Sequence, residues 1–232
     1  MNSDRSEVTS SIGERITKIS SSLPSSVRLI AVSKTVSAEM MRSAYAAGIR
    51  DFAESRIQEA AKKQAQLQDL SDITWHFIGH LQSNKAKKAL EQFSWIHSVD
   101  NLQLAQRLDQ IAEQLGVTPN VCLQVKILPD PNKGGWTIPQ LLNDLSVINQ
   151  YKNLHIQGLM TIPPLGLNEA EILNVFNTTR DLAKTIRDQH WSHIEMQHLS
   201  MGMSGDYHLA VQAGATMVRL GTILFGDRTE QI

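Results

Sequence analysis

The stretch from Leu154 to Arg187 reads LHIQGLMTIPPLGLNEAEILNVFNTTRDLAKTIR. Its opening part, Leu154 to Ile162, is an apolar run of the length of one buried strand. Asn168 and Glu171 then form an N-terminal capping pattern for a helix. That helix carries a stripe at helical spacing, formed by Ile172, Val175, Thr179, Leu182 and Ile186. A strand followed by a capped helix is the repeating unit of a parallel sheet.

The same unit recurs along the whole chain. Eight short apolar runs predict strands over Leu29–Lys34, Asp51–Ser55, Thr74–His80, Trp95–Asp100, Asn120–Ile127, Leu154–Ile162, Glu195–Met201 and Met217–Phe225. Each of the first seven precedes a candidate helix, such as the one after Asp100 that Gly116 ends. Eight strands alternating with helices, without a Gly/Pro/Ser-rich linker, predict an α/β fold in which residues 1–232 form a single (β/α)8 TIM-barrel domain.

An additional N-terminal helix is expected before the first strand. Val8, Ile12, Ile16, Ile19 and Leu23 recur at helical spacing, and this helix would cover the place of a last barrel helix. The alternative architecture is an open, doubly wound sheet. Against that alternative, no Gly-x-Gly-x-x-Gly follows the first apolar run, so the dinucleotide-binding fingerprint is missing.

Composition excludes several classes of partner. The 232 residues are 41% hydrophobic and 19% charged, with a formal net charge of -1, which gives no broad attraction for nucleic acid or an anionic membrane. No signal-peptide or membrane-spanning segment is visible. The single cysteine, Cys122, sits in an apolar run where a buried, inert thiol is expected. A cytoplasmic protein is the natural interpretation.

Lys34 ends the first predicted strand and is therefore placed at the mouth of the barrel. Partial burial there would favour the neutral amine, which is the form that attacks a carbonyl to give a Schiff base. The alternatives are a solvated lysine or an ion pair with Glu54.

Two turns at the other end of the chain have the composition of phosphate-binding loops. They run from Ser200 to Gly205, after the seventh strand, and from Arg219 to Thr222, at the end of the eighth. Barrels commonly bind phosphate in these two loops, where backbone N–H groups and hydroxyls surround the anion. Arg219 alternates with Met217 and Gly221 and should face the barrel interior. Its partner there is either a carboxylate, such as Glu54, or a pyridine nitrogen.

These residues resemble the pyridoxal phosphate homeostasis proteins, whose fold is similar to the N-terminal barrel of bacterial alanine racemase. The likeness is carried by WHFIGHLQSNK at 75–85, by Ala31–Lys34, Gly158–Pro163, Ser200–Ser204 and Val218–Thr222, and it extends from Leu29 to Arg228. The resemblance implies pyridoxal 5'-phosphate as cofactor, with Lys34 as the Schiff-base lysine and Arg219 facing the pyridine nitrogen. It also implies that Ser204, Gly221 and Thr222 hold the phosphate. Further candidate cofactor-binding residues within or beside these motifs are Ser200, Met201, Ser55, His80 and Thr161.

Two positions depart from the family pattern. Ala53-Glu54-Ser55 stands where the family has Gly-Glu-Asn, which puts direct ring contact by Ser55 in doubt. Lys126 stands where the family has asparagine. Lys126 either presents a second amine near the site or faces solvent.

Three functions are compatible with a Schiff-base lysine in a barrel. The family resemblance favours a non-catalytic carrier or regulator of the vitamin B6 pool and of amino-acid and keto-acid balance, acting as a monomer with transient contact to client enzymes. An amino-acid racemase is disfavoured because the chain has no second domain to supply an opposing base, and Tyr207 is the only tyrosine expected near the site. A colourless Schiff-base aldolase for a phosphorylated substrate is the third hypothesis. A metal site at His76 and His80, or at His190 and His193, lacks a third ligand.

Overall fold

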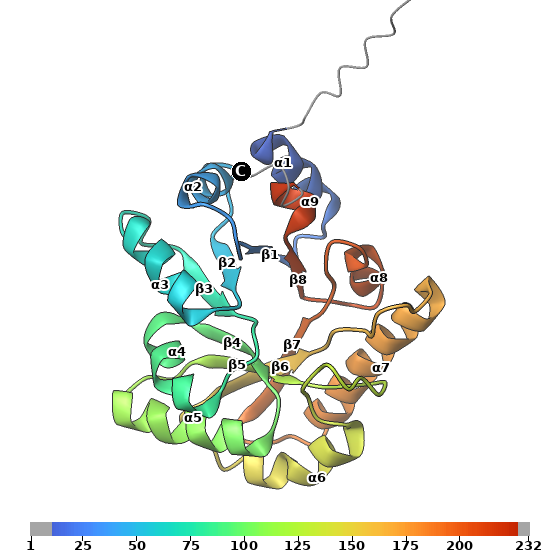
Figure 1. The fold of residues 1–232 in the computed structure, drawn as a ribbon. Helices are drawn as coiled ribbons and strands as arrows, with labels where there is room; N and C mark the ends of the chain where they lie inside the picture. The colour runs from blue at the N-terminus through green and yellow to red at the C-terminus, as the bar shows by residue number, and fades with distance from the viewer. Residues whose placement is uncertain (1–10, 227–232) are drawn as a thin grey trace, which may run out of the picture.

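A computed structural model of the chain describes residues 11–226. Its strands form one closed parallel barrel in the order β1 to β8 (Figure 1). The bounds are Arg28–Val32, Asp51–Glu54, Thr74–Phe77, Trp95–Val99, Asn120–Gln124, His155–Met160, Ile194–Ser200 and Met217–Leu220. The predicted barrel is therefore confirmed, and the open doubly wound sheet is not the fold of this protein.

Helices surround the barrel on the outside (Figure 1). They are α1 (Ile12–Ser22), α2 (Ala38–Ala46), α3 (Ile57–Gln66), α4 (Ala86–Gln92), α5 (Leu102–Leu115), α6 (Ile138–Ile148), α7 (Glu169–Arg187), α8 (Tyr207–Gln212) and α9 (Thr222–Phe225), with a 3-10 turn, η1, at Ser83–Lys85. Each of the first seven strands is followed by a helix, as the sequence predicts. Helix α1 packs against α2 and α9, which is the place of a last barrel helix. Val8 of the predicted N-terminal stripe lies outside the described residues.

Local sequence explains where two of these helices begin or end. Helix α7 starts with the predicted capping box, because the Asn168 side chain accepts from the Glu171 N–H while the Glu171 carboxylate accepts from the Asn168 N–H. Helix α5 ends at Gly116, whose φ of 65° is left-handed and costs glycine little. Within the described residues, no helix combines the length and the apolar character that a bilayer crossing requires.

All strands but β7 are shorter than predicted, and one prediction is wrong in the type of element. The eighth apolar run does not continue as a strand to Phe225, because β8 stops at Leu220 and Thr222–Phe225 forms the short helix α9. A short apolar run does not distinguish a strand from a buried helical turn by its periodicity. The correction matters because it places Thr222 at the start of α9, at the barrel mouth.

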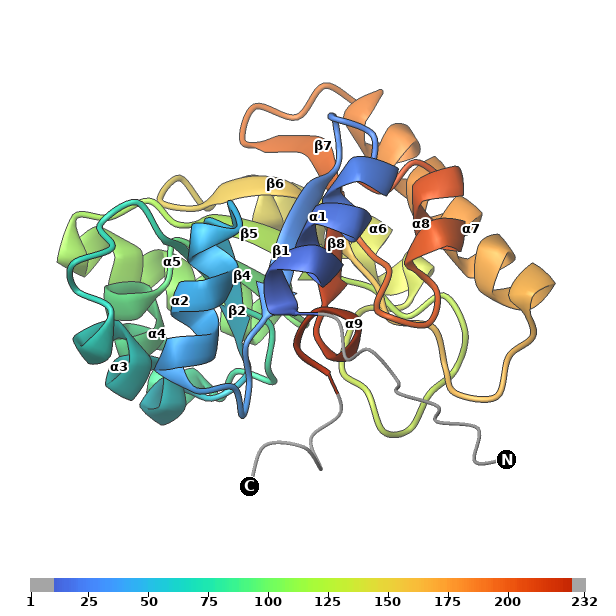
Figure 2. The same cartoon turned by 90° about the horizontal axis from the view of Figure 1, so that it is seen from above.

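Strand alternation divides the core into two layers. Side chains that face the inside of the barrel are Ile30, Val32, Ala53, Trp95, Cys122, Met160 and Met217. The other face of each strand packs against the helices, as Val218 and Leu220 do on β8. Cys122 is fully buried, and burial raises the pKa of its thiol to about 12, which agrees with the expected inert cysteine. The loops that follow β1, β5, β6 and β7 lie with α9 at one end of the barrel (Figure 2).

Candidate functional site

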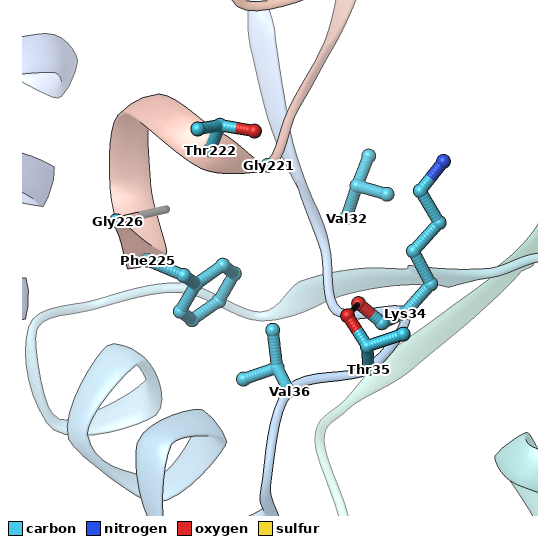
Figure 3. A pocket seen from close by; sticks show the side chains of 8 residues that line it. All are labelled: Val32, Lys34, Thr35, Val36, Gly221, Thr222, Phe225 and Gly226. Atoms are coloured by element: carbon cyan, nitrogen blue, oxygen red, sulfur yellow. Dashed lines mark hydrogen bonds between the residues drawn. The ribbon is translucent and has the colours of Figure 1, made fainter. Parts of the chain in front are cut away.

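Lys34 lies at this end of the barrel, just beyond β1. It follows Ile30 and Val32 on the inward face of the strand, and it lines a small pocket of about 40 Å³ together with Val32, Gly221 and Thr222. In Figure 3, Val32 lies between the Lys34 side chain and the Gly221–Thr222 turn. The expected partial burial of Lys34 is wrong, because its side chain is exposed. The amine is therefore open to a molecule arriving from solvent.

The main chain on both sides of Lys34 is fixed from behind. The Lys63 Nζ, on α3, donates to the Ser33 carbonyl at 2.6 Å, while the Glu59 carboxylate accepts from the Thr35 N–H at 2.5 Å. Thr35 has a φ of 66°, a left-handed conformation that is unfavourable for a β-branched residue. Contacts on both flanking peptides hold this conformation, and with it the direction in which Lys34 leaves the strand.

Glu54 belongs to the same cluster and is not a partner of Lys34 or of Arg219. Its Oε1 accepts from Lys63 at 2.8 Å and from the Ser33 hydroxyl at 2.7 Å, on the helix side of the barrel wall. The side chain is fully buried, and burial raises the pKa of its carboxyl although the hydrogen bonds from Lys63 and Ser33 oppose that shift. Strand alternation explains the correction, since Ala53 faces inward and Glu54 outward.

The two predicted glycine- and serine-rich turns meet in space. The Ser204 Oγ accepts from the Gly221 N–H at 3.3 Å and from the Ile223 N–H at 3.5 Å. Thr222, next to Gly221, is exposed at the pocket that Lys34 lines. Hydroxyls and backbone N–H groups therefore gather a short distance along the barrel rim from an exposed amine, which is an arrangement suited to an anion.

Arg219 faces the barrel interior, as strand alternation predicts. Its side chain is 3% exposed, its Nη1 donates to the Ser200 Oγ at 2.6 Å, and its Nη2 donates to the Thr161 carbonyl at 3.1 Å. Within residues 11–226 it forms no ion pair with a carboxylate. Burial lowers the pKa of Arg219 to about 10, so the guanidinium is still protonated at neutral pH.

A chain of polar side chains continues from Arg219 through the barrel. The Ser200 Oγ lies 2.7 Å from His97 Nδ1, His97 Nε2 lies 2.9 Å from His76 Nδ1, and His76 Nε2 lies 2.9 Å from Asp51 Oδ1. His97 and Asp51 were not among the sequence candidates. Alternation on β4 is the signal that would have found His97, since it shares the inward face with Trp95.

Two of the remaining candidates, Met201 and Thr161, have buried side chains that do not reach the barrel mouth. Met201 is fully buried in the layer between barrel and helices, so the structure does not bring its side chain to the mouth. Thr161 is also buried, and its hydroxyl donates to the Val125 carbonyl at 3.0 Å. Their contribution to a ligand site would therefore be through the main chain.

Ser55 and His80 lie at the rim, in the loops that follow the neighbouring strands β2 and β3. Ser55 follows β2 and is half-buried, and a Cβ added to Gly79 would lie only 2.2 Å from its carbonyl oxygen. His80 is exposed and lies 3.3 Å from Asp100. His76 and His80 thus have separate partners, and among the described residues no group of three His, Cys, Asp or Glu could hold a metal ion.

The structure shows where Lys126 and Tyr207 lie relative to the site. Lys126 is partly buried and lines cavities of about 520 and 720 Å³ beside the loop between β5 and α6, away from the pocket that contains Lys34. Tyr207 packs against the core and lines a cavity with Arg15, Ile19 and Ile223 on the α1 side of the barrel. Tyr207 is thus a packing residue.

Comparison with known proteins identifies the family. A family model described as "Alanine racemase, N-terminal domain" matches residues 9–229. A relative from Synechocystis sp., named Pyridoxal phosphate homeostasis protein, is 56% identical over 91% of this chain and 96% of its own length. A protein of the same name from Pseudomonas aeruginosa is 41% identical over 94% of this chain and 96% of its own. The chain belongs to the pyridoxal phosphate homeostasis protein family. The resemblance inferred from the motifs is confirmed.

Solved structures extend this family assignment. PipY from Synechococcus elongatus PCC7942, solved with PLP bound, is 52% identical with a TM-score of 0.89, and the match covers 93% of this chain and 100% of that one. The same protein solved without PLP is 53% identical with a TM-score of 0.90, over the same shares of the two chains. Alanine racemase from Clostridium difficile 630 shares the fold at 16% identity and a TM-score of 0.69, over 94% of this chain and 56% of that chain.

Proposed function

We propose that this protein binds pyridoxal 5'-phosphate as a Schiff base on Lys34 and serves vitamin B6 homeostasis without catalysing a reaction of its own. The observation that carries the proposal is the exposed Lys34 amine beside the turn of Gly221 and Thr222. A primary amine and an anion-binding turn are the two groups that an aldehyde bearing a phosphate requires. PipY, the relative that is 52% identical, was solved with PLP bound.

Besides the aldehyde, the cofactor has two polar ends, its phosphate and its pyridine nitrogen, and we assign each to its own group of residues. Ser204, Gly221 and Thr222 would hold the phosphate with hydroxyls and N–H groups. Arg219, a buried cation without a carboxylate partner in residues 11–226, would meet the pyridine nitrogen with an N–H that the protein leaves free. The bound cofactor would supply an electron-accepting ring. Arginine keeps its proton and does not protonate the ring nitrogen, which makes the ring a weaker electron acceptor than an aspartate at this position would.

The exposure of Lys34 favours a role in which the cofactor is exchanged. An amine open to solvent lets water and competing amines reach the linkage, so cofactor is both taken up and released, whereas an enzyme active site typically excludes water. We extend the proposal to a monomeric, cytoplasmic protein that makes transient contact with client enzymes. The proposed binding region is completed by Ser200, Ser55 and His80, and by the main chain of Met201 and Thr161.

A titration with pyridoxal 5'-phosphate, followed by visible absorbance, tests this function. The wild type and Lys126→Ala should each develop a yellow species with one equivalent of cofactor, and Lys34→Ala should not. A colourless wild type would overturn the proposal and favour the aldolase. A second assay distinguishes a carrier from an enzyme. The protein loaded with cofactor should restore activity to a cofactor-free PLP enzyme, and it should show no turnover of D- or L-amino acids.

A further inference from the structure

The chain of side chains from Arg219 to Asp51 crosses the inside of the barrel, and nothing in the proposed binding of the cofactor needs its far half. Its members come from five strands: Arg219 on β8, Ser200 on β7, His97 on β4, His76 on β3 and Asp51 on β2. Ser200, His76 and His97 are fully buried. Burying a polar group destabilises the folded protein unless the group is hydrogen-bonded. A fully hydrogen-bonded chain of this length inside a barrel therefore suggests a function.

Hydrogen-bond chemistry gives this chain one direction. Arginine only donates, so the Ser200 Oγ accepts from Arg219, and its single hydrogen is left for His97 Nδ1. An imidazole that accepts at Nδ1 and is neutral carries its hydrogen on Nε2. His97 therefore donates to His76 Nδ1, and His76 in turn donates from Nε2 to the Asp51 carboxylate. The Ser200 hydroxyl and both ring N–H groups between Arg219 and Asp51 then each have an acceptor.

Both ends enforce the same direction, because arginine cannot accept and an ionised aspartate cannot donate. The groups that face His97 also oppose a charge on it. Burial holds the pKa of His97 well below its ordinary value, and the nearby His76, Arg219, Arg28 and His198 lower it further. Burial lowers the pKa of His76 as well, although Asp51 opposes that shift.

We propose that Ser200, His97 and His76 are positioning residues that orient the Arg219 guanidinium through a one-way chain of hydrogen bonds ending on Asp51. The inference rests on the proposed function, since it concerns the face that Arg219 turns toward the cofactor ring. Ser200 takes one Nη1 hydrogen and the Thr161 carbonyl takes one Nη2 hydrogen, which fixes the plane of the guanidinium and leaves its other N–H groups for a ligand. The chain supplies a fixed acceptor without placing a carboxylate beside the ring site.

Nuclear magnetic resonance on the cofactor-free protein tests the chain independently of cofactor binding. With 15N-labelled histidine, His76 and His97 should each show a protonated Nε2 and an unprotonated Nδ1 from about pH 5.5 to about pH 8. A protonated Nδ1 on either ring, or a titration within that range, would overturn the direction of the chain. The ring nitrogen signals of His193, which is exposed, provide the comparison within the same spectrum.

Cofactor titration tests the positioning. Ser200→Ala removes the acceptor of a charged donor and should weaken pyridoxal 5'-phosphate binding about tenfold, whereas Ser200→Thr keeps the hydroxyl and should retain most of the affinity. Thr179→Val, which removes a buried hydroxyl on α7, should bind like the wild type. Normal binding by Ser200→Ala would overturn this inference alone. Failure of the wild type to bind would instead sink the proposed function.

Discussion

At the residue scale, the direction of Lys34 depends on residues behind the barrel wall. Lys63 contacts the Ser33 carbonyl and the carboxylates of Glu54 and Glu59. Glu54 is fully buried, and its Oε2 has no hydrogen-bond partner among the described residues. Lys63 is therefore the cation that stabilises the buried Glu54 carboxylate. Through the Ser33 carbonyl it also fixes the peptide that precedes Lys34.

Replacing Lys63 by methionine should destabilise the protein by about 3–5 kcal/mol, because a buried charge is left without its partner. The loss is measured as a lower midpoint in guanidinium chloride unfolding. Lys62→Met, at the exposed neighbouring position of α3, is the matched control and should change stability by less than about 0.5 kcal/mol. Equal stability of the two variants would contradict the role given to Lys63.

Ser204→Ala should weaken binding of pyridoxal 5'-phosphate and leave binding of pyridoxal, which has no phosphate, nearly unchanged. The Ser204 Oγ is one of the hydroxyls proposed to hold the phosphate, and it also contacts the Gly221 N–H. Loss of one hydrogen bond to a charged group corresponds to about tenfold in affinity. The measurement is a pair of absorbance titrations, and an equal loss for both ligands would show that the serine acts elsewhere.

Several site residues could be predicted because strands alternate with a period of two. That rule places Lys34 and Arg219 on the inward face without any knowledge of the helices. The alternation rule does not predict which side chains from other elements contact Lys34 and Arg219. The sequence suggests Glu54 as a partner for both, whereas Glu54 pairs with Lys63 of α3, and the rotation of that helix about its own axis depends on packing. Met201 was placed at the site although it is the outward neighbour of Ser200.

At the element scale, close packing of β6 on β7 depends on one glycine. A Cβ added to Gly158 would lie 1.8 Å from the His198 carbonyl oxygen, which is backbone of the adjacent strand. The register between these strands shifts nearby, between Ile156 and Gly158. Glycine therefore allows the two strands to approach at this irregularity.

Gly158→Ala should lower stability by about 1–3 kcal/mol or more, since the neighbouring backbone must move to admit the methyl group. Gly13→Ala in α1 is the matched control. There the added Cβ would meet only the Ser11 Oγ, at 3.9 Å, and the change should stabilise the helix by about 0.5–1 kcal/mol. Thermal unfolding of both variants decides the matter, and a Gly158→Ala protein as stable as the wild type would refute the close approach.

Element boundaries show what sequence patterns cannot provide. Helix α7 begins where its capping residues predict, because the cap is a local interaction between Asn168 and Glu171. The end of β8 was missed, because Ile223, Leu224 and Phe225 are equally apolar in a strand and in a helical turn. Only the closure of the barrel, with α9 against α1, decides between the two.

At the scale of the whole molecule, the buried histidines make stability depend on pH. Their pKa values in the folded protein lie below the ordinary value of 6.5, so the unfolded chain binds more protons as the pH falls. The free energy of unfolding should therefore decrease below about pH 6.5, by at most about 1.4 kcal/mol per pH unit for each histidine. The raised pKa of Glu54 acts in the opposite direction.

Comparison of two variants isolates the histidine effect. His97→Gln removes one buried imidazole, so its stability should fall less steeply with acidification than that of the wild type. His193→Gln, at an exposed position, is the matched control for the replacement of a histidine by glutamine. Denaturant midpoints at about pH 7.5, 6.5 and 5.5 provide the slopes. Identical slopes for wild type and His97→Gln would mean that His97 takes up a proton equally in the folded and the unfolded protein, which its burial forbids.

The barrel itself was predictable because its signal is repeated eight times along the chain, and errors of a few residues at each strand do not change the topology. The polar chain inside the barrel was not, since it joins side chains from β2, β3, β4, β7 and β8 that only closure brings together. Local patterns give elements and faces, while contacts across the barrel require the structure.

The most direct test of the account is to reduce the protein with borohydride in the presence of pyridoxal 5'-phosphate and to locate the adduct by peptide mass mapping. One stable adduct is expected on the peptide that contains Lys34, and none at Lys126. An adduct on Lys126 alone, or a reduced protein that carries no adduct, would contradict the central claim that Lys34 holds the cofactor.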